Sequence, residues 1–255
     1  MKDLFRKYSV SFLFLMVVII FNNTTAHAED DDYDCKFYNA YISGDMSEWP
    51  DWISEMEQAY SKNNSTETLK DIVVAYYGYV AWLIGVDREG EAENYIDKAE
   101  HYISELSEYS SYKSYAEAMQ GAFLAYRISL NKSRAIYLGP RSIRHINRAI
   151  ELDSDNPYAW VEKGNAAYHM PRAIGGSYKE AAEHFKKAID GLEEGSSTPE
   201  CNWVYLNAMA WLAQSYDNTG EVDKAFKVYE KILSIEPNFQ WIRDELYPEF
   251  KERVR

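Results

Sequence analysis

The chain has few of the residues that support covalent or metal chemistry. Its 255 residues include only two cysteines, Cys35 and Cys201, and five histidines. The motifs G-x-S-x-G, H-E-x-x-H, G-x-x-x-x-G-K-[ST] and G-x-G-x-x-G are absent from the sequence. We therefore predict a protein that is not an enzyme and carries no cofactor. The cysteine spacing does not suit a metal site, and the sequence alone leaves open whether the two residues form a disulfide.

Positive charge is also scarce. The chain has 27 Lys and Arg against 41 Asp and Glu, a formal net charge of −14. Binding of nucleic acid depends on a clustered basic surface that neutralises phosphates, so this composition argues against it. The same balance argues against contact with anionic membrane surfaces. A solvated acidic exterior, which keeps a protein in solution, is the simplest interpretation.

Long apolar runs are limited to the N-terminus. A run of about a dozen apolar residues, 10–21, follows a basic start with Lys2, Arg6 and Lys7, and an A-x-A sequence ends at Ala28. This order is typical of a signal peptide, so we predict cleavage near Ala28 and export to the periplasm or the exterior. An uncleaved membrane anchor is the alternative. No later segment is apolar enough to span a bilayer, so no membrane insertion is expected after cleavage.

The sequence that follows the predicted signal peptide is expected to form helices. We expect an acidic, disordered leader over 29–36 and an all-α domain over 37–255, because apolar residues recur three and four positions apart. Turn residues divide the domain into helical hairpins. The expected hairpins cover about 37–61, 66–107, 112–153, 156–191 and 200–237, and a capping helix covers 239–254.

The last hairpin carries a recognisable pattern. Its small and large residues fall at fixed offsets, namely Leu212, Ala213, Tyr216, Ala225, Tyr229 and Pro237. The fourth hairpin repeats part of the pattern with Trp160, Gly164, Ala181, Phe185 and Ala188. These residues resemble the 34-residue tetratricopeptide repeat. The match is weaker in the earlier hairpins, which have longer turns. It extends more loosely to exported bacterial tetratricopeptide proteins, including the periplasmic helical partners of TRAP-type transporters.

The resemblance implies a right-handed superhelix of stacked hairpins, an α-solenoid, whose first helices line a concave face. When the ligand-facing positions of the repeat family are transferred one by one to this sequence, the concave face would present Tyr79, Trp82, Tyr126, Asn165, Tyr168, His169, Gln214 and Asn218. Aromatic and amide side chains suit an extended peptide, an amphipathic helix or a stacked sugar. The alternative is that a tyrosine stripe at helical spacing forms the core between repeats.

Two segments depart from the regular pattern. We interpret 136–141 and 169–176 as inserted turns that combine Pro, Gly, Arg and apolar residues. Arg141 and Arg172 are candidates to clamp a carboxylate or phosphate. Alternatively, each insert packs on its neighbour and its arginine pairs with a glutamate. His184 and Glu180 are better explained as a surface helix pair than as metal ligands.

These observations favour a non-catalytic scaffold or adaptor that binds a protein or peptide of the cell envelope on its concave face. The second hypothesis is a periplasmic small-molecule-binding or transport-accessory protein, with a pocket closed by the inserted turns. Metal ions and nucleic acid are not expected partners.

Overall fold

The computed structural model describes residues 33–193 and 200–255, which belong to one compact unit, Tyr33–Arg255. The predicted signal peptide and residues 29–32 of the expected leader lie outside the described residues. Helix α1 begins at Tyr33, so residues 33–36 are helical, and the expectation of disorder was wrong for them. None of the helices in the described ranges is both long and apolar enough to cross a membrane.

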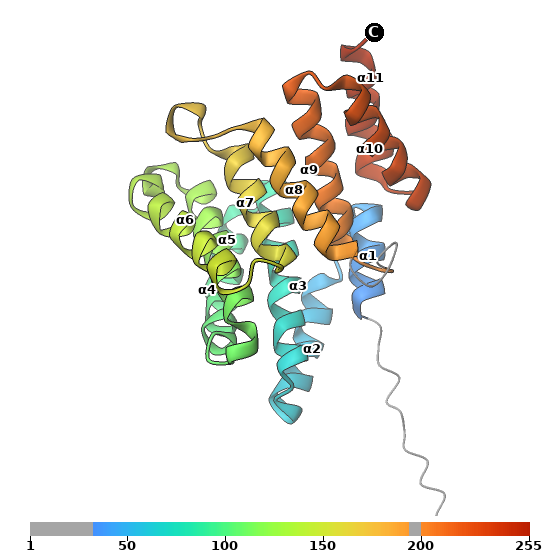
Figure 1. The fold of residues 1–255 in the computed structure, drawn as a ribbon. Helices are drawn as coiled ribbons and strands as arrows, with labels where there is room; N and C mark the ends of the chain where they lie inside the picture. Colours follow the sequence, from blue (N-terminus) through green and yellow to red (C-terminus); the bar gives the residue numbers. More distant parts are fainter. Residues whose placement is uncertain (1–32, 194–199) are drawn as a thin grey trace, which may run out of the picture. The chain divides into compact units, whose positions relative to one another are not determined.

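The described ranges are all-α, as the sequence predicted, and consecutive helices pack in antiparallel pairs (Figure 1). The pairs are α1 (Tyr33–Ser43) with α2 (Trp49–Asn63), α3 (Thr66–Gly85) with α4 (Glu89–Leu106), α5 (Lys113–Leu130) with α6 (Ala135–Leu152), α7 (Pro157–His169) with α8 (Tyr178–Glu193), and α9 (Trp203–Thr219) with α10 (Val222–Ile235). A π-helical segment, Trp241–Leu246, leads into the last helix, α11 (Tyr247–Arg253). This stack of hairpins is a tetratricopeptide-like solenoid.

Polar side chains begin several helices. Ser65 accepts a hydrogen bond from the Thr68 amide at 3.3 Å, and Asn156 accepts one from the Tyr158 amide at 3.0 Å. Ser177 accepts a bond from the Glu180 amide at 3.2 Å, which is one of the two bonds of a capping box. Each bond satisfies an amide that has no partner within its helix. The turn after α9 uses Gly220, whose φ of 76° suits glycine.

Small residues let helices approach closely. A Cβ added to Gly164 of α7 would lie only 2.7 Å from the ring of Phe185 in α8. Ala181 and Ala188 of α8 are also fully buried, as are Ala213 and Ala225 in the last hairpin. These are positions that the repeat pattern assigned to helix contacts, so the local sequence explains the packing within these hairpins.

The first and fifth hairpins also contact each other. Trp203 of α9 packs against Trp49 of α2, with ring centroids 5.7 Å apart, and against Tyr77 of α3 at 6.0 Å. A disulfide joins Cys35 of α1 to Cys201, just before α9, with Cα atoms 4.6 Å apart. The middle of the concave side is therefore closed by the chain's own aromatic side chains instead of forming an open groove.

One predicted turn is wrong. Residues 136–141 belong to the first turns of α6, with Pro140 inside the helix, and the chain reverses earlier, over 131–134. Asn131 caps this earlier turn by accepting a bond from the Ser133 amide at 3.1 Å. Pro140 faces solvent, and Ser142 on the opposite face holds α6 against α5 by donating a hydrogen bond to the Gly121 carbonyl at 2.7 Å.

Candidate functional site

A polar cluster lies in the interior of the concave side. The Tyr77 hydroxyl donates to Glu162 Oε1 at 2.6 Å, and Asn165 Nδ2 donates to the same oxygen at 3.1 Å. Tyr126 donates to the Tyr77 carbonyl at 3.1 Å. Burial raises the pKa of Glu162 to about 7, although both hydrogen bonds oppose the shift. Tyr77 and Glu162 are buried and bond each other, so we interpret this cluster as part of the core.

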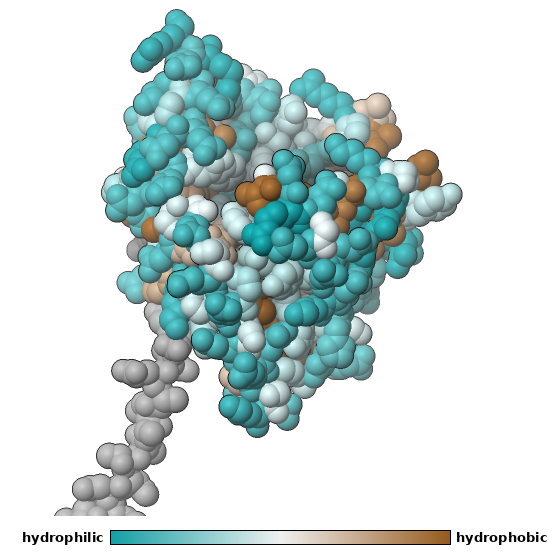
Figure 2. Space-filling model, turned by 180° about the vertical axis from the view of Figure 1, so that it is seen from behind, coloured by the Kyte–Doolittle hydropathy of each residue, from teal (hydrophilic) through white to brown (hydrophobic). Residues whose placement is uncertain are grey.

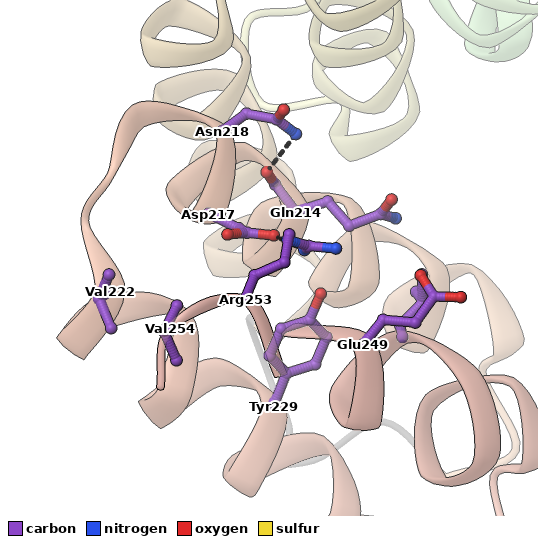
Figure 3. Close-up of a pocket in the computed structure, with 9 residues that line it drawn as sticks. Gln214, Asp217, Asn218, Val222, Tyr229, Glu249, Arg253 and Val254 are labelled. Carbon is purple, nitrogen blue, oxygen red and sulfur yellow. Dashed lines mark hydrogen bonds and ion pairs between the residues drawn. The ribbon is translucent and has the colours of Figure 1, made fainter. Parts of the chain in front are cut away.

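An accessible cavity occurs at the C-terminal end of the stack. It lies between α9, α10 and the helix of residues 241–253, and has a volume of about 660 Å³ (Figure 3). We call it the C-terminal pocket. Its lining consists of Gln214, Asp217, Asn218, Val222, Tyr229, Leu246, Glu249, Arg253 and Val254. The pocket thus lies beyond the last repeat, where no further hairpin covers α9 and α10.

Two polar groups in this pocket lack partners among the described residues. The Tyr229 side chain is fully buried, and its hydroxyl has no hydrogen-bond partner. Gln214 Nε2 is also buried without one. Figure 3 shows Tyr229 pointing from α10 toward Arg253 and Gln214. Burial raises the pKa of Tyr229, so its hydroxyl stays neutral and can both donate and accept a hydrogen bond.

The charged residues of the pocket have a small acidic excess. Arg253 forms an ion pair with Asp217, and Glu249 has no ion pair within the described residues. Asn218 Nδ2 donates to the Gln214 carbonyl at 2.8 Å and to the Tyr168 hydroxyl at 3.1 Å. The pocket can therefore offer amide, hydroxyl and carboxylate groups to a ligand, beside the apolar side chains of Val222, Leu246 and Val254.

Aromatic side chains adjoin the pocket through Tyr168. Its ring packs against Trp211 with centroids 4.9 Å apart and against Tyr178 at 5.0 Å. The His169 ring lies 4.8 Å from Trp211, and desolvation lowers the pKa of His169. Arg172 stacks over Tyr178 at 5.2 Å. We call these residues the aromatic cluster.

The structure brings five of the predicted site residues into one continuous region. Tyr168, His169 and Arg172 belong to the aromatic cluster, and Gln214 and Asn218 line the C-terminal pocket. The Asn218–Tyr168 hydrogen bond joins the two groups.

The other five predicted residues lie elsewhere. Tyr126 and Asn165 are partly buried and belong to the polar cluster around Glu162. Tyr79 is buried in the core against Trp82 and the aromatic side chain of Tyr95 in α4, so it offers no surface to a ligand. Arg141 is exposed on α6.

Sequence reasoning missed the residues that complete the pocket. Tyr229 was identified only as a repeat position, and Glu249 and Arg253 only as parts of a capping helix. The local sequence carries no motif for them, because the pocket forms where this helix crosses α9 and α10. The sequence feature that could have predicted the pocket is the end of the repeat array, because no further hairpin packs on the concave surface of the last repeat.

Comparisons with known proteins agree with the fold. A model of the tetratricopeptide repeat matches residues 206–239. No curated protein matches the chain. Among solved structures, the HusA haemophore from Porphyromonas gingivalis is similar, with a TM-score of 0.61 and 16% sequence identity, covering 74% of this chain and 94% of that chain. At this identity the likeness concerns the fold. The chain is therefore a tetratricopeptide-like helical protein that contains one clear tetratricopeptide repeat.

Proposed function

We propose that this protein is a non-catalytic scaffold that holds a peptide segment of a partner protein in the C-terminal pocket. Tetratricopeptide repeats generally mediate interactions between proteins, which supports the broad class. The observation that carries the specific proposal is the Tyr229 hydroxyl, which is buried and unpartnered at the wall of an open cavity. Buried polar groups nearly always find a hydrogen-bond partner, and a bound peptide would supply one.

The pocket's chemistry favours a peptide with a basic side chain. Gln214 and Tyr229 can bond the amide and carbonyl groups of a peptide backbone. Asp217 and Glu249 outnumber the single cation, Arg253, so a Lys or Arg of the partner would complete the charge balance. The net charge of −14 favours the approach of such a segment.

We further propose that the protein acts after export, in the periplasm or outside the cell, on a partner of the cell envelope. The N-terminal sequence motivates this location. The Cys35–Cys201 disulfide supports it, because structural disulfides are typical of oxidising compartments.

A peptide selection followed by calorimetry tests the proposal. Peptides are selected from a random display library on the chain and then titrated against wild type, Tyr229→Phe and Gln214→Ala. Each variant should weaken binding by about 5- to 10-fold, because each removes about one hydrogen bond. Tyr216→Phe is the matched control, because Tyr216 lies on α9 outside the pocket lining. Selected peptides that bind Tyr229→Phe and Gln214→Ala as tightly as wild type would overturn the pocket assignment.

A second candidate function is the binding of a flat small molecule at the aromatic cluster. His169 and Trp211 lie face to edge beside Tyr168, and the lowered pKa of His169 favours the neutral imidazole that ligates metals. The similar structure is described as a haemophore, which motivates haemin as the probe. Titration should give saturable spectral change in wild type and a loss in His169→Ala. His101→Ala, on α4, is the control. Unsaturable change, or equal binding by His169→Ala, would exclude this function.

A further inference from the structure

Large apolar side chains protrude at the turns between paired helices. Ile136 and Tyr137, at the start of α6, are 78% and 76% exposed, and Ile174, in the α7–α8 turn, is 67% exposed. Exposed apolar side chains mark a contact surface where several of them lie together. Figure 2 shows apolar side chains gathered at the outer edge of the molecule on this side.

These turns share one edge of the stack. Helices α5 and α7 pack side by side, and each is followed by the turn that leads to its antiparallel partner. Consecutive hairpins of a solenoid place such turns along the same edge. In Figure 1 the α5–α6 and α7–α8 turns both lie at the upper left.

The two segments that carry these turns contain no acidic residues, in contrast with the start of the neighbouring α4, whose Glu93 pairs with Arg134 of the α5–α6 turn. Residues 118–150 contain no Asp or Glu, nor do residues 163–179, although the whole chain has 41 acidic residues. Both segments contain Lys and Arg. Arg141 and Arg144 are exposed on α6 and form no ion pair within residues 33–193 and 200–255. Arg172 lies in the α7–α8 turn, over Tyr178.

Helix periodicity places the apolar and basic groups together. At 100° per residue, Ile136, Tyr137, Arg141 and Arg144 fall on one half of α6, while the buried Ser142, Ile146 and Ala149 occupy the other half. We define the basic edge as the exposed residues Ile136, Tyr137, Arg141, Arg144, Arg172 and Ile174. It combines protruding apolar tips with unpaired cations.

We propose that the basic edge docks onto an anionic lipid surface. The apolar side chains stand on convex turns, which suit insertion among headgroups better than capture of a protein segment in a groove. Tyrosine and arginine are favoured at the membrane interface, and each basic residue near an anionic surface adds to the attraction. None of the six residues of the basic edge lines the C-terminal pocket, so the proposal does not rest on the pocket's function.

The acidic net charge does not prevent such docking. Exposed charges act over about one Debye length, ~8 Å at physiological ionic strength, so a membrane in contact with this edge interacts chiefly with its local cations. The expectation drawn from the total charge, that the protein avoids anionic membranes, therefore does not apply to this edge.

Vesicle cosedimentation tests the proposal. Since the described core lies within 33–255, the assay uses a chain that begins at Glu29 and so excludes the apolar N-terminus. Wild type should bind vesicles of phosphatidylcholine mixed with phosphatidylglycerol and not phosphatidylcholine alone. Arg141→Gln/Arg144→Gln should reduce partitioning roughly 25-fold, at about fivefold for each cation. Ile136→Ser/Ile174→Ser should also reduce it.

The control variant is Lys62→Gln/Lys113→Gln. These exposed lysines lie at the end of α2 and the start of α5, on the opposite edge. Their replacement removes the same number of positive charges as the replacement of Arg141 and Arg144. This variant should bind mixed vesicles as wild type does, with an unchanged circular dichroism spectrum. Equal loss in the control and in Arg141→Gln/Arg144→Gln would overturn the proposal, as would absence of wild-type binding. Binding of polyglutamate without vesicle binding would also overturn it and would assign the edge to an acidic protein partner.

Discussion

Replacement of the buried Glu162 by Gln should stabilise the protein at high pH and have little effect at low pH. Glu162 is 4% exposed on α7 and has a pKa of about 7, against an ordinary value of 4.5. The folded state therefore binds a proton more tightly than the unfolded state does. Its charged form is disfavoured by burial, and a neutral glutamine does not carry that cost.

The pKa difference sets the size of the effect. A shift of about 2.5 units corresponds to about 3 kcal/mol between the protonation states. Because the carboxyl pKa is raised, wild type has no penalty below pH 4.5. The penalty then grows by about 1.4 kcal/mol per pH unit and is complete above pH 7. Glutamine can still accept hydrogen bonds from Tyr77 and Asn165 through its own Oε1.

Urea and thermal unfolding of wild type and Glu162→Gln, at pH 4.5 and pH 8, measure this effect. Taking the difference between the two proteins cancels the titration of all other groups. We expect similar stability at pH 4.5, and at pH 8 an advantage for Glu162→Gln of about 3 kcal/mol, or about 6–12 °C in Tm. Glu252→Gln, on the exposed side of α11, is the control and should show no such pH-dependent advantage.

A pH-independent difference between wild type and Glu162→Gln would refute this reasoning. It would mean that Glu162 is ionised to the same extent in the folded and unfolded states, and hence that water reaches the polar cluster. The concave side would then be open at its centre and could itself receive a ligand.

Three further predictions concern stability. Cys35→Ser/Cys201→Ser should lose about 4–5 kcal/mol in urea unfolding, because the disulfide closes a loop with a sequence separation of 166, and reductant should lower wild type to the same level. Gly164→Ala should cost about 1–3 kcal/mol, since its Cβ would lie 2.7 Å from the buried Phe185 ring. The control Gly85→Ala, with no atom within 4 Å, should cost nothing or add about 0.4–1 kcal/mol. Tyr229→Phe should leave the free protein unchanged or raise its stability by about 1 kcal/mol in urea unfolding, because the hydroxyl it removes is buried without a partner. A loss of stability in Tyr229→Phe would show that the hydroxyl already has a partner.

Local sequence patterns predicted the fold well where the repeat is regular. In the last hairpin, Ala213 and Ala225 of the repeat pattern are buried at helix contacts, and Gly220 makes the turn between the two helices. Such features depend on neighbours three or four positions away, so a single sequence contains the necessary information. The capping box at Ser177 was predictable for the same reason.

Long-range packing was not predictable in the same way. The Gly139–Pro140 pair is a strong turn signal, and only the contact of Ser142 and Ile146 with α5 explains why the helix continues through it. Likewise, the contact between Trp203 and Tyr77 joins residues from α9 and α3, so the closure of the concave side was not visible in the sequence. Half of the predicted site residues therefore lie in or near the candidate site, while Tyr79 lies in the core.

The central claim is that a partner peptide occupies the C-terminal pocket. The most direct measurement is amide chemical-shift mapping of the chain during titration with a selected peptide. We predict that the largest changes fall on α9, α10 and residues 241–253, centred on Gln214, Tyr229 and Arg253. Changes confined to α3, α5 and α7, with the pocket residues unaffected, would contradict the account and would return the binding site to the concave face predicted from the repeat pattern.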